Sequence, residues 1–216
     1  MILTIEGRCI VHRVPREHAA DDPMHEHWLI WNLIPLLWVI WCLYWIISAR
    51  NAKRTVRRES YASRASHVLP LVAAILLIAL PELPAPIFAA RILPRTFATY
   101  WAGVALVFLG LSFAVWARRH IGRNWSGTVT VKEDHVLVTT GAYHWARHPI
   151  YTGLLAAVAG STIARGELRG VWAIALCTIA FVIKLRLEER WMRQVFGEAY
   201  ERYSAKVPAL IPLWPR

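Results

Sequence analysis

Two short polar blocks contain the residues whose types and spacing could do chemistry. In the first, GAYHWARHPIYTG, Arg147 and His148 stand directly before Pro149 and an apolar run. A proline suits the first turn of a helix, and the free N–H groups and positive dipole at that end attract a carboxylate or another anion. In the second, LRLEERWMRQVFGEAYERY, the adjacent acids Glu188 and Glu189 could receive a ligand amine. The two blocks together offer sites for an anion and for an amine.

Each feature also has a purely structural interpretation. A basic pair such as Arg147 and His148 at the end of a membrane segment can be an interfacial anchor. The two acids can lie on a solvated helix face and pair with Lys184 and Arg186 on neighbouring turns. An anchor alone needs neither the glycines and proline around it nor a second charged block returned to it by the chain. The combination therefore favours a binding site.

Apolar segments surround the polar blocks, and a helix needs about 20 apolar residues to cross a membrane. The first segment is long enough, and the second contains LPELPAP, whose prolines must break its helix near the far end. The third contains Gly103 and Gly110, small residues that allow close helix packing. The sequence predicts an all-α integral membrane protein with about five transmembrane helices. The segments are 28–48, 68–90, 97–117, 150–164 and 171–183.

The fourth and fifth segments are separated only by RGELRG, and each is short for a straight crossing. We expect a helical hairpin whose second helix runs on into the charged block. The hairpin would return the second polar block to the first, so that His148 and Glu188 meet although they are far apart in the sequence. Before the hairpin, the alternation in TVTVKEDHVLVTTG predicts two short extended pieces around a turn at residues 132–134, which would form a lid or wall.

Composition and charge indicate a membrane protein. Hydrophobic residues make up 56% of the 216 residues, and mean hydropathy is +0.36. The net charge of +11 comes from short basic blocks beside apolar runs. These blocks fit membrane topology and anionic lipid headgroups better than a nucleic-acid surface. We expect a lipid bilayer as partner and no nucleic acid.

The arrangement of charge predicts orientation and organisation. The strongly basic loop after the first segment places the N-terminus outside and both polar blocks in the cytosol. Residues 1–27 form a polar extension without the features of a signal peptide, and residues 28–216 form a single membrane domain. The three scattered cysteines indicate no disulfide framework, and the sequence contains no cluster typical of a metal site.

Three blocks of this sequence resemble one known family. GAYHWARHPIYTG, LRLEERWMRQVFGEAYERY and VPALIP are similar to the isoprenylcysteine carboxyl methyltransferase family. These are integral membrane enzymes that use S-adenosylmethionine and are related to phospholipid N-methyltransferases. The resemblance covers about residues 121–212, and the Arg-His-Pro-x-Tyr-x-Gly motif with a Glu-Glu pair at this separation is specific.

The resemblance implies a cytosolic donor pocket formed by the hairpin and the C-terminal helix. Glu188 would hold the amino group of the methionine part of S-adenosylmethionine, while Arg147, His148 and the helix end would hold its carboxylate. These three side chains are the candidate catalytic residues, and Lys184 or Arg186 would lie nearer the acceptor. The residues implied for the donor pocket are Lys132, His135, Val136, Leu137, Val138, Tyr143, Arg147, His148, Tyr151, Glu188 and Glu189.

The implied reaction is methyl transfer to a lipophilic acceptor, with a carboxylate of isoprenylcysteine type favoured and a phospholipid amine or small thiol as alternatives. A sulfonium methyl is already activated, so a carboxylate needs alignment, desolvation and charge balance rather than a triad or a metal. Two other classes remain. A sterol-reductase-like NADPH enzyme would have a similar pocket, but the chain offers no evident site for a second nucleotide arm. A non-enzymatic membrane adaptor would explain the basic loops and leave Glu188 without a role.

Overall fold

The computed structural model describes residues 32–50, 55–80, 86–125, 130–132 and 136–210. The chain divides into the units Met1–Asn32 and Leu33–Arg216, and every helix and strand named below belongs to the second unit. The polar extension predicted for residues 1–27 lies outside the described residues.

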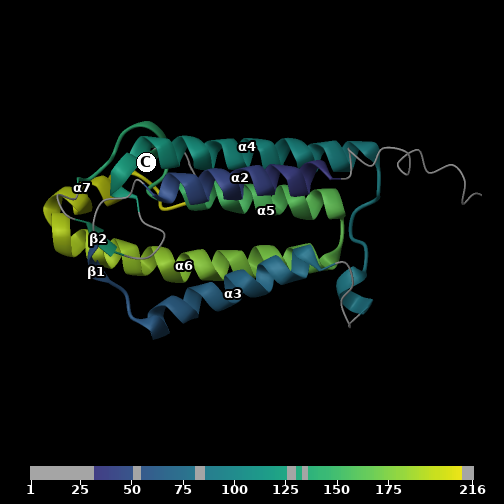
Figure 1. Cartoon of the computed structure of the whole chain (residues 1–216), viewed down its shortest axis with the longest axis horizontal. Helices are drawn as coiled ribbons and strands as arrows, with labels where there is room; N and C mark the ends of the chain where they lie inside the picture. The colour runs from purple at the N-terminus through teal and green to yellow at the C-terminus, as the bar shows by residue number, and fades with distance from the viewer. Residues whose placement is uncertain (1–31, 51–54, 81–85, 126–129, 133–135, 211–216) are drawn as a thin grey trace, which may run out of the picture. The chain divides into compact units, whose positions relative to one another are not determined.

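Long helices make up most of the second unit, and their order follows the five apolar segments of the sequence (Figure 1). Three of the described helices, α3, α4 and α6, are long and apolar enough to cross a membrane, and α2 is apolar but shorter. The protein is therefore a multi-pass membrane protein, and the total of five crossings stays a prediction. The helices are α2 (Leu33–Ala49), α3 (Tyr61–Ala79), α4 (Phe97–Ile121), α5 (Pro149–Arg165) and α6 (Leu168–Phe196).

Helix α3 begins earlier than the apolar pattern indicates. Its first turns are polar, and Ser60 caps them by accepting a hydrogen bond from the Ser63 N–H at 3.2 Å. The helix ends at Ala79, before the proline-rich stretch, as predicted. Pro81 and Pro84 themselves lie outside the described residues, and the short 3-10 helix η1 (Pro86–Ala89) follows them.

Close packing of α4 against α5 confirms the role predicted for the small residues. A Cβ added to Gly103 would meet the Gly160 carbonyl oxygen at 2.5 Å, and one added to Gly110 would meet the Gly153 carbonyl oxygen at the same distance. The glycines recur two turns apart on both helices, so the two backbones touch along a shared groove. Around this pair, α2 packs on α4 and α3 packs on α6.

The segment predicted as two extended pieces folds differently. The strand β2 (Thr130–Lys132) forms an antiparallel pair with β1 (Thr55–Arg58), from the loop after α2. Residues 136–139 are not a strand, and the predicted turn lies partly outside the described residues. The first predicted piece is therefore a strand, and its partner is the distant segment β1. Figure 1 shows β1, β2 and α7 (Glu198–Lys206) at the same end of the long helices.

An arginine–glutamate cluster closes the other end of α5 and α6. Glu167 Oε2 accepts from Arg165 Nε at 3.1 Å and also pairs with Arg169, which is buried. The same two arginines donate to the carbonyls of Ile78 at 2.6 Å and Leu80 at 2.8 Å. These carbonyls belong to the last turn of α3 and to Leu80, which directly follows it, where no helical N–H is left to donate to them. The cluster therefore ties α3 to the hairpin turn.

Candidate active site

A cavity of about 380 Å³ lies among α2, α3, α5, α6 and the segment before α5. Its volume is in the range of small-molecule binding sites. The structure brings together eight of the residues implied for the donor pocket. They are Val136, Leu137, Val138, Tyr143, Arg147, His148, Tyr151 and Glu188.

The remaining predicted residues lie in different places. Lys184 lines the cavity, whereas Glu189 is buried beside it and does not line it. Arg186 is exposed and away from the cavity, so of the two cations proposed for the acceptor only Lys184 is positioned for it. Lys132 belongs to β2 with its side chain outside the described part, and His135 lies outside the described residues.

The start of α5 fixes the position of Arg147 and His148. The helix begins at Pro149, as predicted, with His148 as the residue that precedes its first turn. Upstream, Gly141 has φ +60°, and a Cβ there would meet the ring of His120 at 2.7 Å. Only glycine adopts this conformation without strain while leaving room for that ring. This turn places Tyr143 on the cavity wall.

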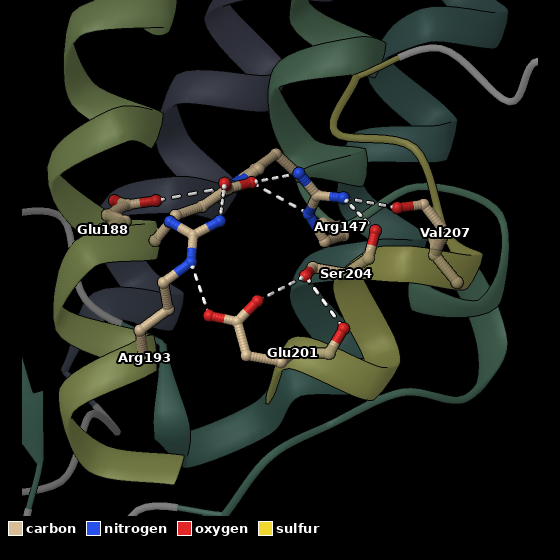
Figure 2. Close-up of polar contacts among 8 residues, drawn as sticks. Arg147, Glu188, Arg193, Glu201, Ser204 and Val207 are labelled. Atoms are coloured by element: carbon tan, nitrogen blue, oxygen red, sulfur yellow. Dashed lines mark hydrogen bonds and ion pairs between the residues drawn. The ribbon is translucent and has the colours of Figure 1, made fainter. Parts of the chain in front are cut away.

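Arg147 joins three parts of the chain (Figure 2). Its Nε and Nη2 donate to Glu189 Oε1 at 2.8 and 2.7 Å. Its Nη1 donates to the carbonyls of Ser204, at 2.9 Å, and Val207. All three guanidinium nitrogens thus have protein partners, and the arginine holds α5, α6 and the segment after α7 together. Its role in holding the donor carboxylate stays a prediction.

The backbone of the same pair is held by the segment that follows α7. The N–H groups of Arg147 and His148 donate to the carbonyls of Pro208 and Ala209, each at 2.9 Å. These acceptors lie in the VPALIP block, so this block holds the backbone of the Arg-His pair in place. Tyr203 adds a third link by donating to the Tyr143 carbonyl at 2.6 Å.

His148 lies between the two glutamates. Its Nδ1 is 3.4 Å from Glu188 Oε2, and its Nε2 is 3.2 Å from Glu189 Oε1. The predicted meeting of His148 and Glu188 across the hairpin is therefore confirmed. Burial lowers the pKa of His148, but the hydrogen bonds and charges of both glutamates outweigh burial and raise that pKa above its ordinary value of 6.5. Two anions thus favour the imidazolium form.

Glu188 is the only acidic side chain that lines the cavity in the described part of the chain. Its Oε1 accepts from the Tyr151 hydroxyl at 2.7 Å. The Tyr151 ring stacks between His148 and Phe181, with centroids 5.5 and 4.8 Å away, and Lys184 Nζ lies 5.5 Å from its centroid. The carboxylate is 22% exposed and is held in a defined direction by aromatic neighbours. A site with this arrangement can bind a cation next to an apolar surface.

Tryptophans form the wall that the prediction missed. Trp38, Trp41 and Trp45 on α2 line the cavity, and Trp125, which follows α4, packs edge-on against Trp45 at 5.2 Å. The spacing 38, 41, 45 puts the three α2 rings on one helix face, and this spacing can be recognised in the sequence. We interpreted the tryptophans only as interfacial belts. Other lining residues outside the prediction are Asn124, Met192, Tyr200 and Tyr203.

Fold and site together define a multi-pass membrane protein with a mostly apolar and aromatic cavity that has a charged group on its wall. Residues 98–199 match the family described as "Phospholipid methyltransferase". This region is therefore similar to the phospholipid and isoprenylcysteine methyltransferases, membrane enzymes that use S-adenosylmethionine. The family resemblance read from the sequence is confirmed.

Individual relatives match parts of the chain. A protein-S-isoprenylcysteine O-methyltransferase of Schizosaccharomyces pombe is 35% identical over 97 residues, covering 44% of this chain and 41% of the relative. A methanethiol S-methyltransferase 1 of Bradyrhizobium diazoefficiens is 39% identical over 75 residues, 34% of this chain and 25% of the relative. The chain thus spans less than half the length of these two relatives.

A solved structure shares the fold. The eukaryotic intramembrane Ras methyltransferase, isoprenylcysteine carboxyl methyltransferase, superposes with a TM-score of 0.50 at 22% identity. The similarity covers 70% of this chain and 65% of that one. It supports the all-helical membrane architecture, and it extends beyond the region matched by the family.

Proposed function

We propose that this protein transfers a methyl group from S-adenosylmethionine to a lipophilic carboxylate, with the cavity end of its helices facing the cytosol. The observation that carries the proposal is that Glu188 is the single acidic side chain, among the described residues, lining a cavity whose walls are mostly aromatic or apolar. The match of residues 98–199 to the phospholipid methyltransferase family supports the same donor. The basic residues of β1, Arg57 and Arg58, support the orientation, because they lie at the cavity end.

The residues present fit this donor. When bound, S-adenosylmethionine supplies a methyl group activated by a sulfonium, together with an ammonium on its methionine part. Glu188 would accept hydrogen bonds from the ammonium, since its carboxylate is oriented by Tyr151 and the pocket contains no competing acid among the described residues. The first turn of α5 would complement the donor carboxylate, whereas both ring nitrogens of His148 already face glutamates.

The state of His148 favours a carboxylate acceptor. A carboxylate reacts as its anion and gives up no proton, whereas a thiol or an ammonium must lose one to a base. His148 is the only imidazole that lines the cavity in the described part, and both of its ring nitrogens face carboxylates. Its raised pKa also lowers the fraction of neutral imidazole that could accept a proton at neutral pH. A site without a ready proton acceptor suits an acceptor that needs none.

Lys184 and the tryptophan wall would position the acceptor. Lys184 lies over the Tyr151 ring on the cavity wall, where an ammonium can attract the acceptor carboxylate. Trp41 also lines the cavity and adds aromatic surface to the same wall. The apolar part between α2 and α3 accommodates a hydrocarbon chain and excludes water from the reacting atoms.

Calorimetric titration of the detergent-purified chain with S-adenosylhomocysteine tests the donor site. Glu188→Gln removes the charge that would hold the ammonium, so we expect binding to weaken by about 10- to 100-fold. The matched control is Glu198→Gln on α7, because Glu198 is 92% exposed and pairs only with Arg202 within its own helix. Equal affinities in both variants would contradict the assignment of Glu188.

A transfer assay with labelled methyl donor tests the acceptor. We expect label in a base-labile ester when the acceptor is a farnesylated N-acetylcysteine. Methanethiol and phosphatidylethanolamine serve as the competing acceptors, the first because of the bacterial relative. Labelled thioether or methylated amine without ester would replace the carboxylate with one of those acceptors.

A further inference from the structure

A buried arginine lies next to the tryptophan wall of the cavity without lining the cavity itself. Arg118, in the last turn of α4, is 4% exposed, and no carboxylate pairs with it in the part of the chain that the structure describes. Its Nε has no hydrogen-bond partner among the same residues. A guanidinium buried without an opposite charge is destabilising unless other groups compensate it. Backbone carbonyls and an aromatic ring take the place of an acid here.

Two carbonyls at helix ends accept hydrogen bonds from Arg118. Its Nη2 donates to Ser48, in the last turn of α2, at 2.6 Å, and its Nη1 donates to Gly122, directly after α4, at 2.8 Å. Carbonyls at the end of a helix lack helical partners, and a cation is favourable there. The Gly122 carbonyl also accepts from the Trp125 N–H at 3.4 Å. Arg118 thus joins the ends of α2 and α4 to the turn that carries Trp125.

The same guanidinium supports a row of aromatic rings. Arg118 Cζ lies 4.4 Å from the centroid of the Trp125 ring, within the range of a cation–π contact. The Trp125 ring packs edge-on against Trp45 at 5.2 Å, and Trp45 stacks on Trp41 at 4.6 Å. All three tryptophans line the cavity. One buried cation therefore holds the end of an aromatic wall that a ligand would contact.

This part of the wall adjoins the residues implied for the methyl donor. Trp45 and Trp125 pack against the buried cluster that contains Tyr143, and Val138 packs against the same cluster. Tyr143 and Val138 both line the cavity and both belong to the implied donor pocket. A side chain that a ligand must order on binding weakens affinity, whereas a side chain already held in place does not. The fixed position of the two indoles therefore bears on donor affinity.

We propose that Arg118 is a positioning residue of the donor site, which holds Trp125 and Trp45 in the arrangement that binds S-adenosylmethionine. The inference rests on the proposed function. It adds a residue that does not line the cavity and lies outside those implied by the family resemblance. It also gives a reason for burying a guanidinium beside two carbonyls and a ring.

A double-mutant cycle on the detergent-purified chain tests this role. Calorimetry with S-adenosylhomocysteine gives the affinities of Arg118→Met, Trp125→Leu and the double variant. We expect Arg118→Met to bind about tenfold more weakly than the parent, because the ligand must then order the rings itself. In the Trp125→Leu background the same change should weaken binding by about threefold or less, because the ring through which Arg118 acts is already gone.

Arg119→Met is the matched control. Arg119 is the next residue of α4, carries the same charge and is exposed, so this variant should bind like the parent. Arg118→Lys keeps the charge but loses the planar fork that reaches two carbonyls, and it should recover only part of the affinity. Binding stoichiometry gives the folded fraction of each variant. If Arg118→Met does not fold, Arg118→Lys with and without Trp125→Leu completes the same cycle.

Methyl-transfer kinetics give a second readout, which separates positioning from a loss of folded protein. Arg118 does not line the cavity, so Arg118→Met should raise the KM for the donor and leave kcat close to that of the parent. A smaller folded fraction would instead lower the apparent kcat and leave KM unchanged.

The outcomes separate this inference from the proposed function. If the parent binds S-adenosylhomocysteine and Arg118→Met binds equally well, the positioning role is wrong and the donor site stands. An equal loss with and without Trp125 overturns the inference as well, because Arg118 then does not act through that ring. A raised KM for the acceptor alone would assign the rings to the acceptor and again overturn it. If the parent does not bind S-adenosylhomocysteine, both proposals fall.

Discussion

The two ends of the α5–α6 hairpin use similar groups for different purposes. At the cavity end, Arg147 pairs with Glu189 and donates to the carbonyls of Ser204 and Val207. At the other end, Arg169 pairs with Glu167 and donates to the carbonyl of Leu80. Both arginines are largely buried, and both tie the hairpin to a neighbouring segment.

The difference lies in what stands beside each cluster. Next to Arg147, a second glutamate, Glu188, lines the cavity, and His148 contacts both acids. At the far end, the carboxylate of Glu167 is shared by two arginines. A buried arginine–carboxylate pair is therefore no sign of a ligand site by itself. The sign is a further charged group that is oriented by its neighbours and faces a cavity.

The largest expected effect is at the cavity end. Arg147→Ala leaves the buried Glu189 without its closest cation and removes the link to the segment after α7, so we expect a loss of about 3–5 kcal/mol in unfolding free energy. Thermal unfolding in detergent measures it. Arg202→Ala breaks an exposed pair with Glu198 and should cost about 0.5 kcal/mol at most. Similar losses in both variants would refute the structural role of Arg147.

The next effect separates stability from binding at the far end. Arg169→Ala removes the pair with Glu167 and the bond to the Leu80 carbonyl, and about 2–3 kcal/mol of stability should be lost. Because this cluster does not line the cavity described above, the affinity for S-adenosylhomocysteine should remain that of the parent. A tenfold weaker affinity in this variant would show that the two ends are coupled.

A pH dependence is expected from the cavity end. The folded pKa of His148 is raised, so its imidazolium stabilises the fold fully below pH 6.5, and this contribution is lost as the pH rises through the raised pKa. A tenfold tighter hold on the proton in the folded state is worth about 1.4 kcal/mol. Denaturant titrations from pH 6 to 9 should show the parent losing stability in this window. His148→Gln should flatten the profile, and exposed His120→Gln should leave it unchanged.

The smallest expected effect concerns the link made by Tyr203. Tyr203→Phe removes one hydrogen bond, to the Tyr143 carbonyl, and should cost about 1 kcal/mol. Tyr61→Phe, at a position 92% exposed, should be neutral in the same unfolding measurement. If the two variants are alike, the segment after α7 depends on Arg147 rather than on this tyrosine.

Some of the site could be read from the sequence because the deciding signals are local. A proline after the Arg-His pair sets the start of α5, and a six-residue polar stretch between two apolar runs sets the hairpin that returns Glu188 to His148. The positions Gly103 and Gly110 predicted a close helix contact, although not that the partners would be glycines as well.

Other parts depend on pairings that no local pattern encodes. The strand β1 lies in a basic loop that we interpreted only as a determinant of topology, and its partner comes from beyond α4. The tryptophans of α2 were assigned to the membrane interface, because the sequence does not show which helix they face. The role of Arg118 was overlooked for the same reason, since its acceptor on Ser48 is 70 residues away in the sequence.

The bonds from Arg147 to the segment after α7 also set an order of assembly. Arg147 and Val207 are 60 residues apart, and α5, α6 and α7 are made between them. During synthesis, the hydrogen bonds from the Arg147 guanidinium and from the two backbone N–H groups of the Arg-His pair cannot form until residues 204–209 have been made. The helical hairpin can therefore enter the bilayer before the pocket exists. A nascent chain stalled before residue 204 should be inserted in the membrane and still be unable to retain S-adenosylhomocysteine.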